Sequence, residues 1–168
     1  MTAPVFVDAN VLLYSRDPLE PAKMSQARAW LDHLWRQSLG CTSMQVLSEF
    51  YVNLKRKAGA GLAPDEAWRE VSKYLAWRPQ AIDEDLFRRA HEIERRHRLS
   101  WWDSMVVAAA QVQHCVLLLT EDLQDGAVLG SVTVRSPFTL AVQEAAAAYT
   151  APRAAPRYRS RGRPRRAA

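Results

Sequence analysis

Three aspartates stand at the ends of apolar runs, where an α/β protein builds its sites. Asp8 directly follows the apolar run 4–7. Asp122 lies in the polar turn after the run 116–119, and Asp103 begins a predicted helix just before that same run. In an open α/β sheet, ligands bind beyond the carboxyl ends of the strands, so acids at these places carry more weight than acids elsewhere. We therefore take these three aspartates as candidate site residues.

Each of these acids also has an ordinary structural role that the sequence leaves open. Asp8 would serve equally well as a helix N-cap, and Asp122 as part of a solvated turn. Asp103 is harder to explain in this way, because at 100° per residue it shares the apolar face of its helix with Val106 and Val107. Burying a carboxylate there is costly, and a helix N-terminus compensates by only up to ~2 kcal/mol. A bound cation would compensate for more of that cost.

Carboxylates that converge without nearby Lys or Arg ionise together only when a hard divalent cation lies between them. Ligation by oxygen alone favours Mg²⁺ or Mn²⁺. The chain has no H-E-x-x-H motif and no Ser-His-Asp order, and its four histidines carry no metal-ligand spacing. These patterns favour metal-assisted hydrolysis of a phosphodiester.

The length of 168 residues allows one domain, at roughly 100 to 200 residues per domain, and a short tail. Hydrophobic residues make up 48% and charged residues 24%, which excludes a wholly disordered chain. The net charge of +5 comes from the tail: residues 151–168 hold seven of the 23 basic side chains and no acid, so residues 1–150 hold 16 basic and 18 acidic side chains. We expect a folded domain over 1–150 and a disordered Arg/Pro/Ala-rich tail over 151–168.

The hydrophobic pattern predicts strands that alternate with amphipathic helices, and a closing helix over 138–149. That order is typical of an α/β domain with a mostly parallel sheet. Periodicity also places Glu49 about 200° from Leu47 on its helix, which predicts a solvated glutamate. The predicted strands are 4–7, 80–82, 116–119 and 132–134.

Four sequence blocks, in this order, resemble the PIN-domain ribonucleases and specifically the VapC-type toxins of toxin–antitoxin pairs. The blocks are FVDANVLLY at 6–14, SMQVLSEF at 43–50, LSWWDS at 99–104 and LLTEDLQDG at 118–126. The resemblance implies a three-layer α/β/α fold and Mg²⁺-dependent cleavage of RNA, with Mn²⁺ as a possible substitute. It also implies a homodimer and inhibition by a small cognate antitoxin.

The resemblance assigns roles to particular residues. It implies that Asp8 and Asp103 are the principal metal ligands. It places Glu49 at the family's acidic position after the second strand, against the solvated interpretation. Asp122 would supply the fourth acid, with Asp125 as second choice.

The neighbours of these acids leave choices open. Asn10 and Ser104 would orient water or a phosphate, and the pair Trp101 and Trp102 would either pack beneath the helix start or stack on a base. A catalytically silent RNA-binding module that uses the basic tail is the alternative function. A phosphatase of the haloacid-dehalogenase type needs a second Asp at the position of Asn10.

The location of the protein is also predicted from the sequence. The start of the chain shows no signal-peptide pattern, and no apolar stretch is long enough for a membrane span. Cys41 and Cys115 form no disulfide or zinc pattern. We expect a cytoplasmic protein with reduced thiols and no membrane partner.

Overall fold

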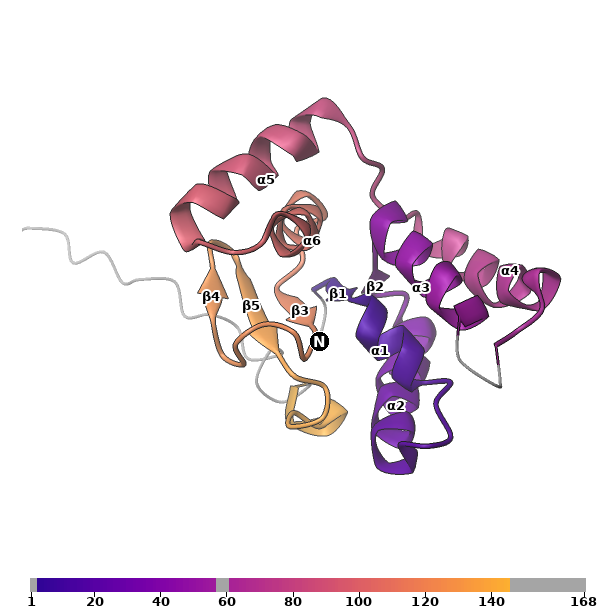
Figure 1. Ribbon diagram of the computed structural model, residues 1–168. Helices are drawn as coiled ribbons and strands as arrows, with labels where there is room; N and C mark the ends of the chain where they lie inside the picture. The colour runs from indigo at the N-terminus through magenta and orange to yellow at the C-terminus, as the bar shows by residue number, and fades with distance from the viewer. Residues whose placement is uncertain (1–2, 57–60, 146–168) are drawn as a thin grey trace, which may run out of the picture.

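A five-stranded sheet of short strands lies at the centre of the computed structural model, which describes residues 3–56 and 61–145 (Figure 1). The strand order is β2-β1-β3-β5-β4, and every neighbouring pair is parallel except β4 with β5. The predicted mostly parallel α/β sheet is therefore confirmed. The strands are β1 (Val5–Val7), β2 (Gly40–Cys41), β3 (Leu117–Leu119), β4 (Val128–Leu129) and β5 (Val132–Arg135).

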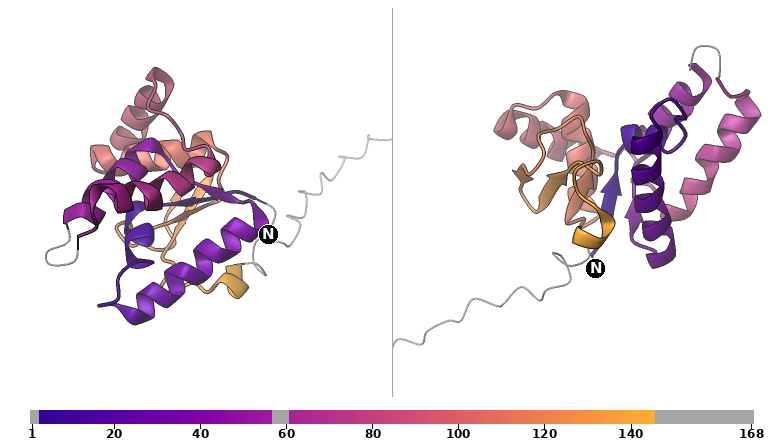
Figure 2. Two further views of the ribbon diagram at one scale, coloured as in Figure 1. Left: turned by 90° about the vertical axis from the view of Figure 1, so that its right-hand side faces the viewer. Right: turned by 90° about the horizontal axis from the view of Figure 1, so that it is seen from below.

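Helices cover both faces of this sheet. Figure 2 shows α2 on one side of the sheet and α5 with α6 on the other, which gives the three layers that the sequence resemblance implied. Figure 1 shows α3 and α4 beside the β2 edge. The helices are α1 (Ala9–Tyr14), α2 (Pro21–Gln37), α3 (Met44–Arg56), α4 (Pro64–Ser72), α5 (Glu84–His97) and α6 (Trp101–Val112), with a 3₁₀ helix (Lys73–Trp77) after α4.

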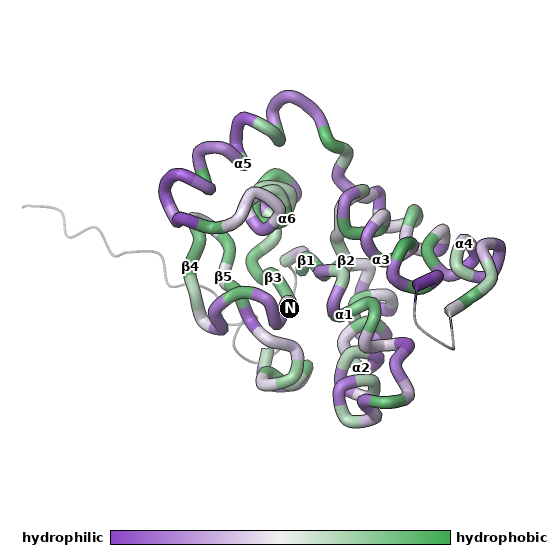
Figure 3. The backbone as a smooth tube through the Cα atoms, viewed as in Figure 1, coloured by the Kyte–Doolittle hydropathy of each residue, from purple (hydrophilic) through white to green (hydrophobic). Residues whose placement is uncertain are grey.

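The core lies around β1 and β3, whose residues are all fully buried. Strands covered on both faces read as continuous apolar runs, which is why both could be predicted from the sequence. Figure 3 shows apolar residues along β3 and mainly polar ones along α5. The buried residues of α5 are Leu86, Ala90 and Ile93.

Two short sheet elements differ from the prediction. The predicted strand at 80–82 is wrong, because Gln80 makes only a single bridge to Ser43 before the chain turns into α5. Strand β4 was not predicted. It forms a hairpin with β5 through the pair Gly130 and Ser131, and Gly130 adopts the positive φ of 65° that this tight turn requires.

Some predictions concern residues at the limits of the described chain. The basic tail at 151–168 lies outside the described residues. Of the closing helix predicted over 138–149, residues 142–145 are helical, and the rest of its C-terminal part is not described. Both cysteines are free thiols, as predicted. Within residues 3–56 and 61–145, no helix is long and apolar enough to cross a membrane.

The order of the strands reverses at β1. The chain passes from β1 to β2 on one side, and then returns to place β3 on the other side of β1. Such a reversal leaves a crevice between the carboxyl ends of the two diverging strands, and ligands of open α/β sheets bind there. The residues that follow β1 and β3 are therefore the first place to look for a site.

Candidate active site

Asp8 and Thr120 join the carboxyl ends of β1 and β3. Asp8 is the N-cap of α1, and its Oδ1 accepts a hydrogen bond of 2.7 Å from the Ala9 N–H. Its Oδ2 accepts a bond of 2.8 Å from the Thr120 hydroxyl. Asp8 is only 8% exposed and Thr120 is fully buried. Asp8 therefore does serve as a helix N-cap, as the sequence left open, but capping uses only one of its two carboxylate oxygens.

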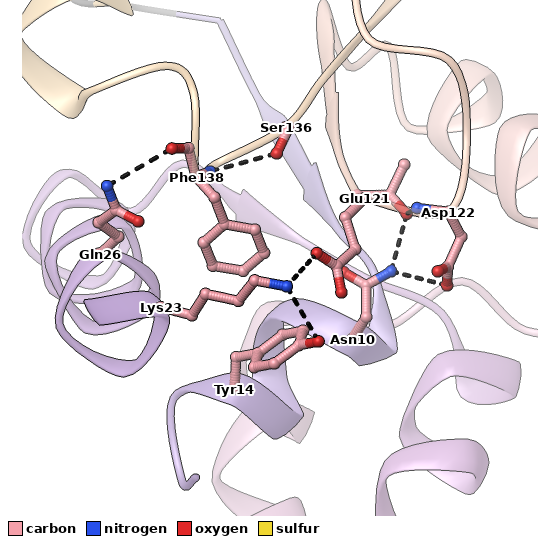
Figure 4. Close-up of polar contacts among 9 residues, drawn as sticks. Asn10, Tyr14, Lys23, Gln26, Glu121, Asp122, Ser136 and Phe138 are labelled. Carbon is pink, nitrogen blue, oxygen red and sulfur yellow. Dashed lines mark hydrogen bonds and ion pairs between the residues drawn. The ribbon is translucent and has the colours of Figure 1, made fainter. Parts of the chain in front are cut away.

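Asn10 connects Asp8 to Asp122. Its Nδ2 donates to Asp122 Oδ2 at 2.9 Å (Figure 4). It also donates to Thr120 Oγ1 at 2.9 Å and lies 3.4 Å from Asp8 Oδ2. The Asp122 N–H also donates to Thr120 Oγ1, at 3.1 Å. The Oδ1 atom of Asn10 is buried and has no hydrogen-bond partner among the residues that the structure describes. A strong acceptor without a donor therefore lies beside two carboxylates.

Burial raises the pKa of Asp8 to about 6. Hydrogen bonds from Thr120 and the Ala9 N–H act in the opposite direction, and the negative charges of Asp122 and Glu49 raise the pKa further. Burial dominates because a carboxylate removed from water loses hydration that two donors restore only in part. Asp8 is therefore an acid whose ionised form is not fully compensated by the groups around it.

Glu49 lies on the exposed side of α3 but still acts on Asp8. Its charge contributes to the raised pKa of Asp8, so the helix presents it toward the same site. The buried Gln45 fixes its position: Gln45 Nε2 donates to Glu49 Oε1 at 3.1 Å and to the Trp102 carbonyl at 3.3 Å. Helical periodicity correctly predicted that Glu49 is exposed, but the exposed side of the helix at this point faces Asp8.

Asp103 lies in the first turn of α6 and is partly buried. Its Oδ2 accepts a bond of 2.6 Å from the hydroxyl of Ser100, the N-cap residue, and its N–H donates to the same hydroxyl. The Ser104 hydroxyl donates to the Ser100 carbonyl and is used within the helix. The structure thus joins Asp8 and Asp122 through Asn10, and gives Asp103 a capping contact of its own.

Asp125 is occupied in a different way from Asp122. Its carboxylate accepts bonds of 2.9 Å from Arg135 Nε, 2.9 Å from the Ser136 N–H and 3.0 Å from the Thr139 hydroxyl. Partial burial raises the pKa of Asp125, but these three donors together outweigh it and lower that pKa. Asp125 thus connects the turn at 122–125 to the end of β5, whereas Asp122 accepts a hydrogen bond from Asn10.

A lysine on α2 holds the turn that carries Asp122. Lys23 Nζ donates to Glu121 Oε2 at 2.7 Å and to the Tyr14 hydroxyl at 3.1 Å. It lies 4.3 Å from the ring centroid of Tyr14 and 5.0 Å from that of Phe138 (Figure 4). The hydrogen bond to Glu121 raises the pKa of Lys23. Lys23 is thus paired with Glu121, the residue next to Asp122, and positions the turn.

Two residues of this site were missed in the sequence. Thr120 received no role, although a hydroxyl at the carboxyl end of an apolar run, two residues before an acid, is a signal that could have drawn attention to it. Gln45 gave no signal, because only the tertiary structure shows that it contacts α6.

The donor types at the site fit a hard divalent cation. Asp8, Asp122 and the unpaired Oδ1 of Asn10 offer only oxygen, which Mg²⁺ and Mn²⁺ prefer. A bound cation would also stabilise the ionised form of Asp8, which burial disfavours. Across residues 3–56 and 61–145, however, no group of three or more His, Cys, Asp or Glu side chains is arranged so that it could hold a metal ion.

A family comparison identifies the family of the chain. The family model described as PIN domain matches residues 5–124 of the sequence. Because the match covers most of the chain, the chain belongs to the PIN domain family.

Solved structures with this fold have low sequence identity to the chain. The DNA-bound VapBC from Salmonella typhimurium has a TM-score of 0.56 and 15% identity, over 80% of this chain and 98% of that chain. VapBC2 from Rickettsia felis, bound to a DNA fragment from its promoter, has a TM-score of 0.55 and 12% identity, over 79% and 97% of the two chains. No curated protein matches the sequence. At these identities the likeness shows the fold.

Proposed function

We propose that the chain is a metal-dependent endoribonuclease and the toxin of a toxin–antitoxin pair. One observation carries the proposal: a buried carboxylate, Asp8, lies at the switch point of the sheet with a raised pKa, next to an unpaired amide oxygen and within the field of Asp122 and Glu49. Membership of the PIN domain family and the fold of the VapBC structures support it.

The side chains have distinct parts in the proposed reaction. The sequence resemblance implies that Asp8 and Asp103 would hold the cation, and Asp122 and Glu49 would complete the acidic site. When bound, Mg²⁺ or Mn²⁺ supplies Lewis-acid stabilisation of the charge that develops on the phosphate. Thr120 fixes the orientation of Asp8 through the bond to Oδ2.

The remaining groups of the site position the nucleophile. Asn10 holds Asp122 through Nδ2, which leaves its Oδ1 to orient the attacking water. Glu49 and Asp122 are the groups that would take the proton from that water, because Asp8 is buried and already accepts two hydrogen bonds of 2.7 and 2.8 Å.

Metal removal tests this proposal. The purified chain is incubated with a mixed RNA pool in Mg²⁺, in Mn²⁺ and in EDTA, and cleavage sites are read by sequencing the product ends. We expect cleavage in both metals, none in EDTA, and recovery when Mg²⁺ is restored in excess. Cleavage that continues in EDTA would contradict the proposal. RNA binding without cleavage in any metal would favour the silent binding module.

We also propose a small antitoxin protein as the partner and a homodimer as the state of the free chain. The VapBC structures with the same fold support the first of these. A protein that binds over the acidic site should protect RNA from cleavage at equimolar concentration. Analytical ultracentrifugation of the free chain tests the second, because a monomer at micromolar concentration would contradict it.

The two aspartates of the 122–125 turn should give opposite results when each is changed to Asn. We expect Asp122→Asn to lower cleavage by about 100-fold with little change in stability, because it removes a charge at the site and keeps an acceptor for Asn10. Asp125→Asn should lower the free energy of unfolding by about 1 kcal/mol, since its partly exposed charge meets Arg135 and two further donors. It should leave cleavage nearly unchanged.

Steady-state cleavage and urea denaturation of both variants measure these effects. Each variant serves as the control for the other, because both lose one carboxylate from the same turn. Loss of cleavage in Asp125→Asn at a temperature where it is folded would make Asp125 the fourth acid instead.

A further inference from the structure

An apolar groove opens beside Glu49. It has a volume of about 490 Å³, and its apolar wall is formed by Trp102, Ile82 and Val52. Glu49 and Arg56 lie on the same lining. We call this hollow the Trp102 groove. It joins an acid of the candidate site to exposed apolar surface.

The two adjacent tryptophans have different surroundings. Trp101 packs edge to face against Phe87 on α5, with ring centroids 5.3 Å apart. Trp102 is 62% exposed and lies on the groove. Exposed apolar side chains that gather in one hollow, as Trp102 does with Ile82 and Val52, form the kind of surface that a ligand covers. Of the two roles left open by the sequence, Trp101 therefore has the packing role, and Trp102 is available for stacking on a ligand.

The backbone that carries the indole of Trp102 is linked to one of the acids. Gln45, which is buried, donates from one nitrogen to both Glu49 Oε1 and the Trp102 carbonyl. A single side chain thus fixes the backbone that presents the indole and the carboxylate that acts on Asp8. A ligand that occupies the groove will lie in a defined register with the acidic site.

The groove also continues past the acids along α3. Asn53 and Arg56 line the Trp102 groove and also a second hollow, of about 380 Å³, whose lining includes Asn10 and Tyr14. Arg56 thus places a positive charge between two hollows that border the acidic site. This arrangement of an apolar aromatic wall and a cation along one path suits a single nucleic-acid strand, whose bases stack and whose phosphates are anionic.

We propose that Trp102 stacks on a base of the single-stranded RNA substrate, in the nucleotide that adjoins the scissile phosphate. This inference rests on the proposed function. Glu49 lines the same hollow as Trp102, so a strand whose phosphate lies at Asp8 and Glu49 can place its next nucleotide along the wall that contains Trp102. Unpaired bases of RNA are recognised by stacking on aromatic side chains, and every base has a face that stacks. Arg56 then contacts the backbone of the same strand.

The test compares four variants with wild type on RNA oligonucleotides that span a mapped cleavage site. We expect Trp102→Ala to lower kcat/KM about tenfold or more, mainly through KM, because a stacked base contributes to binding. Trp102→Phe keeps an aromatic face and should stay near wild type, whereas Trp102→Leu keeps only apolar bulk and should resemble Trp102→Ala. The matched control is Trp68→Ala, since Trp68 is 57% exposed on α4 and lines neither hollow.

Oligonucleotides with an abasic site at each position identify the stacked base. At one position next to the cut, loss of the base should slow wild type about as much as Trp102→Ala does, and should slow Trp102→Ala no further. Thermal denaturation of all variants checks that each is folded. The exposed position of Trp102 makes large losses of stability unexpected.

The outcomes separate this inference from the proposed function. If wild type cuts RNA but Trp102→Ala cuts equally well, or if Leu restores cleavage as well as Phe, the stacking role is wrong while the nuclease function stands. An antitoxin that loses affinity for Trp102→Ala, with RNA cleavage unchanged, would assign the groove to the protein partner instead. If wild type cuts no RNA in any metal, the proposed function fails, and this inference fails with it.

Discussion

Replacing Asp8 with Asn should abolish metal-dependent RNA cleavage, with a fall in kcat/KM of at least about 1000-fold. Asparagine keeps the shape of the side chain and an oxygen that accepts from the Ala9 N–H. It removes the negative charge at the buried centre of the site. A cation that stabilises a reacting phosphate contributes several kcal/mol, and each 1.36 kcal/mol corresponds to about tenfold in rate. Loss of the charge that retains this cation should therefore remove most of the activity.

A second N-cap aspartate provides the matched control. Asp83 is the N-cap of α5 and accepts from the Leu86 N–H at 2.8 Å, whereas Asp8 is the N-cap of α1 and accepts from the Ala9 N–H. Asp83→Asn should cut RNA at the wild-type rate. Both proteins are purified identically and assayed in Mg²⁺ over a 1000-fold range of concentration. If Asp8→Asn retains more than a tenth of wild-type activity, Asp8 has no part in metal-dependent catalysis and the nuclease assignment of this site is wrong.

The same substitution should increase stability at neutral pH. The pKa of Asp8 is about 6 in the folded chain and 3.8 in the ordinary, exposed state. Between these values the folded state binds more protons than the unfolded state, so the free energy of unfolding falls as the pH rises through this window and stays low above it. The difference corresponds to about 3 kcal/mol. Asp8→Asn avoids this loss and should be about 1 to 3 kcal/mol more stable than wild type at pH 8 in EDTA.

The gain should be mostly lost near pH 4, close to the ordinary pKa of 3.8, and should vanish below about pH 3, where Asp8 is protonated in both folded and unfolded chains. Part of the gain at pH 8 is offset, because the amide nitrogen of the new side chain faces the Thr120 hydroxyl and Asn10 Nδ2. Urea denaturation of wild type, Asp8→Asn and Asp83→Asn at several pH values between 4 and 8 measures the effect. Adding Mg²⁺ at pH 8 should stabilise wild type and not Asp8→Asn. A variant less stable than wild type by the same amount at every pH would show that Asp8 is not destabilised by burial.

The sequence by itself determined the elements that carry the site and two of their acids. β1 and β3 are buried on both faces, so their apolar runs mark them without any tertiary information. Asp8 follows the first run directly and Asp122 comes three residues after the second, and ligands of open α/β sheets bind beyond the carboxyl ends of the strands. Four motifs in order also indicated the PIN domain family, and the family match over 5–124 confirms it.

The sequence could not determine short strands and the faces of exposed helices. The run 80–82 had strand-like residues but no partner along its length, and β4 has only two residues, too few for a periodic signal. Glu49 illustrates the second limit. Helical periodicity tells whether a side chain is buried, but it does not tell what an exposed side chain faces.

Only the tertiary structure decided which polar groups meet. Asp125 accepts a hydrogen bond from Arg135 on β5 and Asp122 accepts one from Asn10, although both acids lie in one turn. The tertiary structure used Trp101 for packing and presented Trp102 at the groove, although the two are adjacent. The raised pKa of Asp8 likewise depends on burial in the folded chain, and it is partly offset by the hydroxyl of Thr120, which lies 112 positions further along the chain. Each of these choices depends on contacts between segments that are distant in sequence, and local patterns carry no information about such contacts.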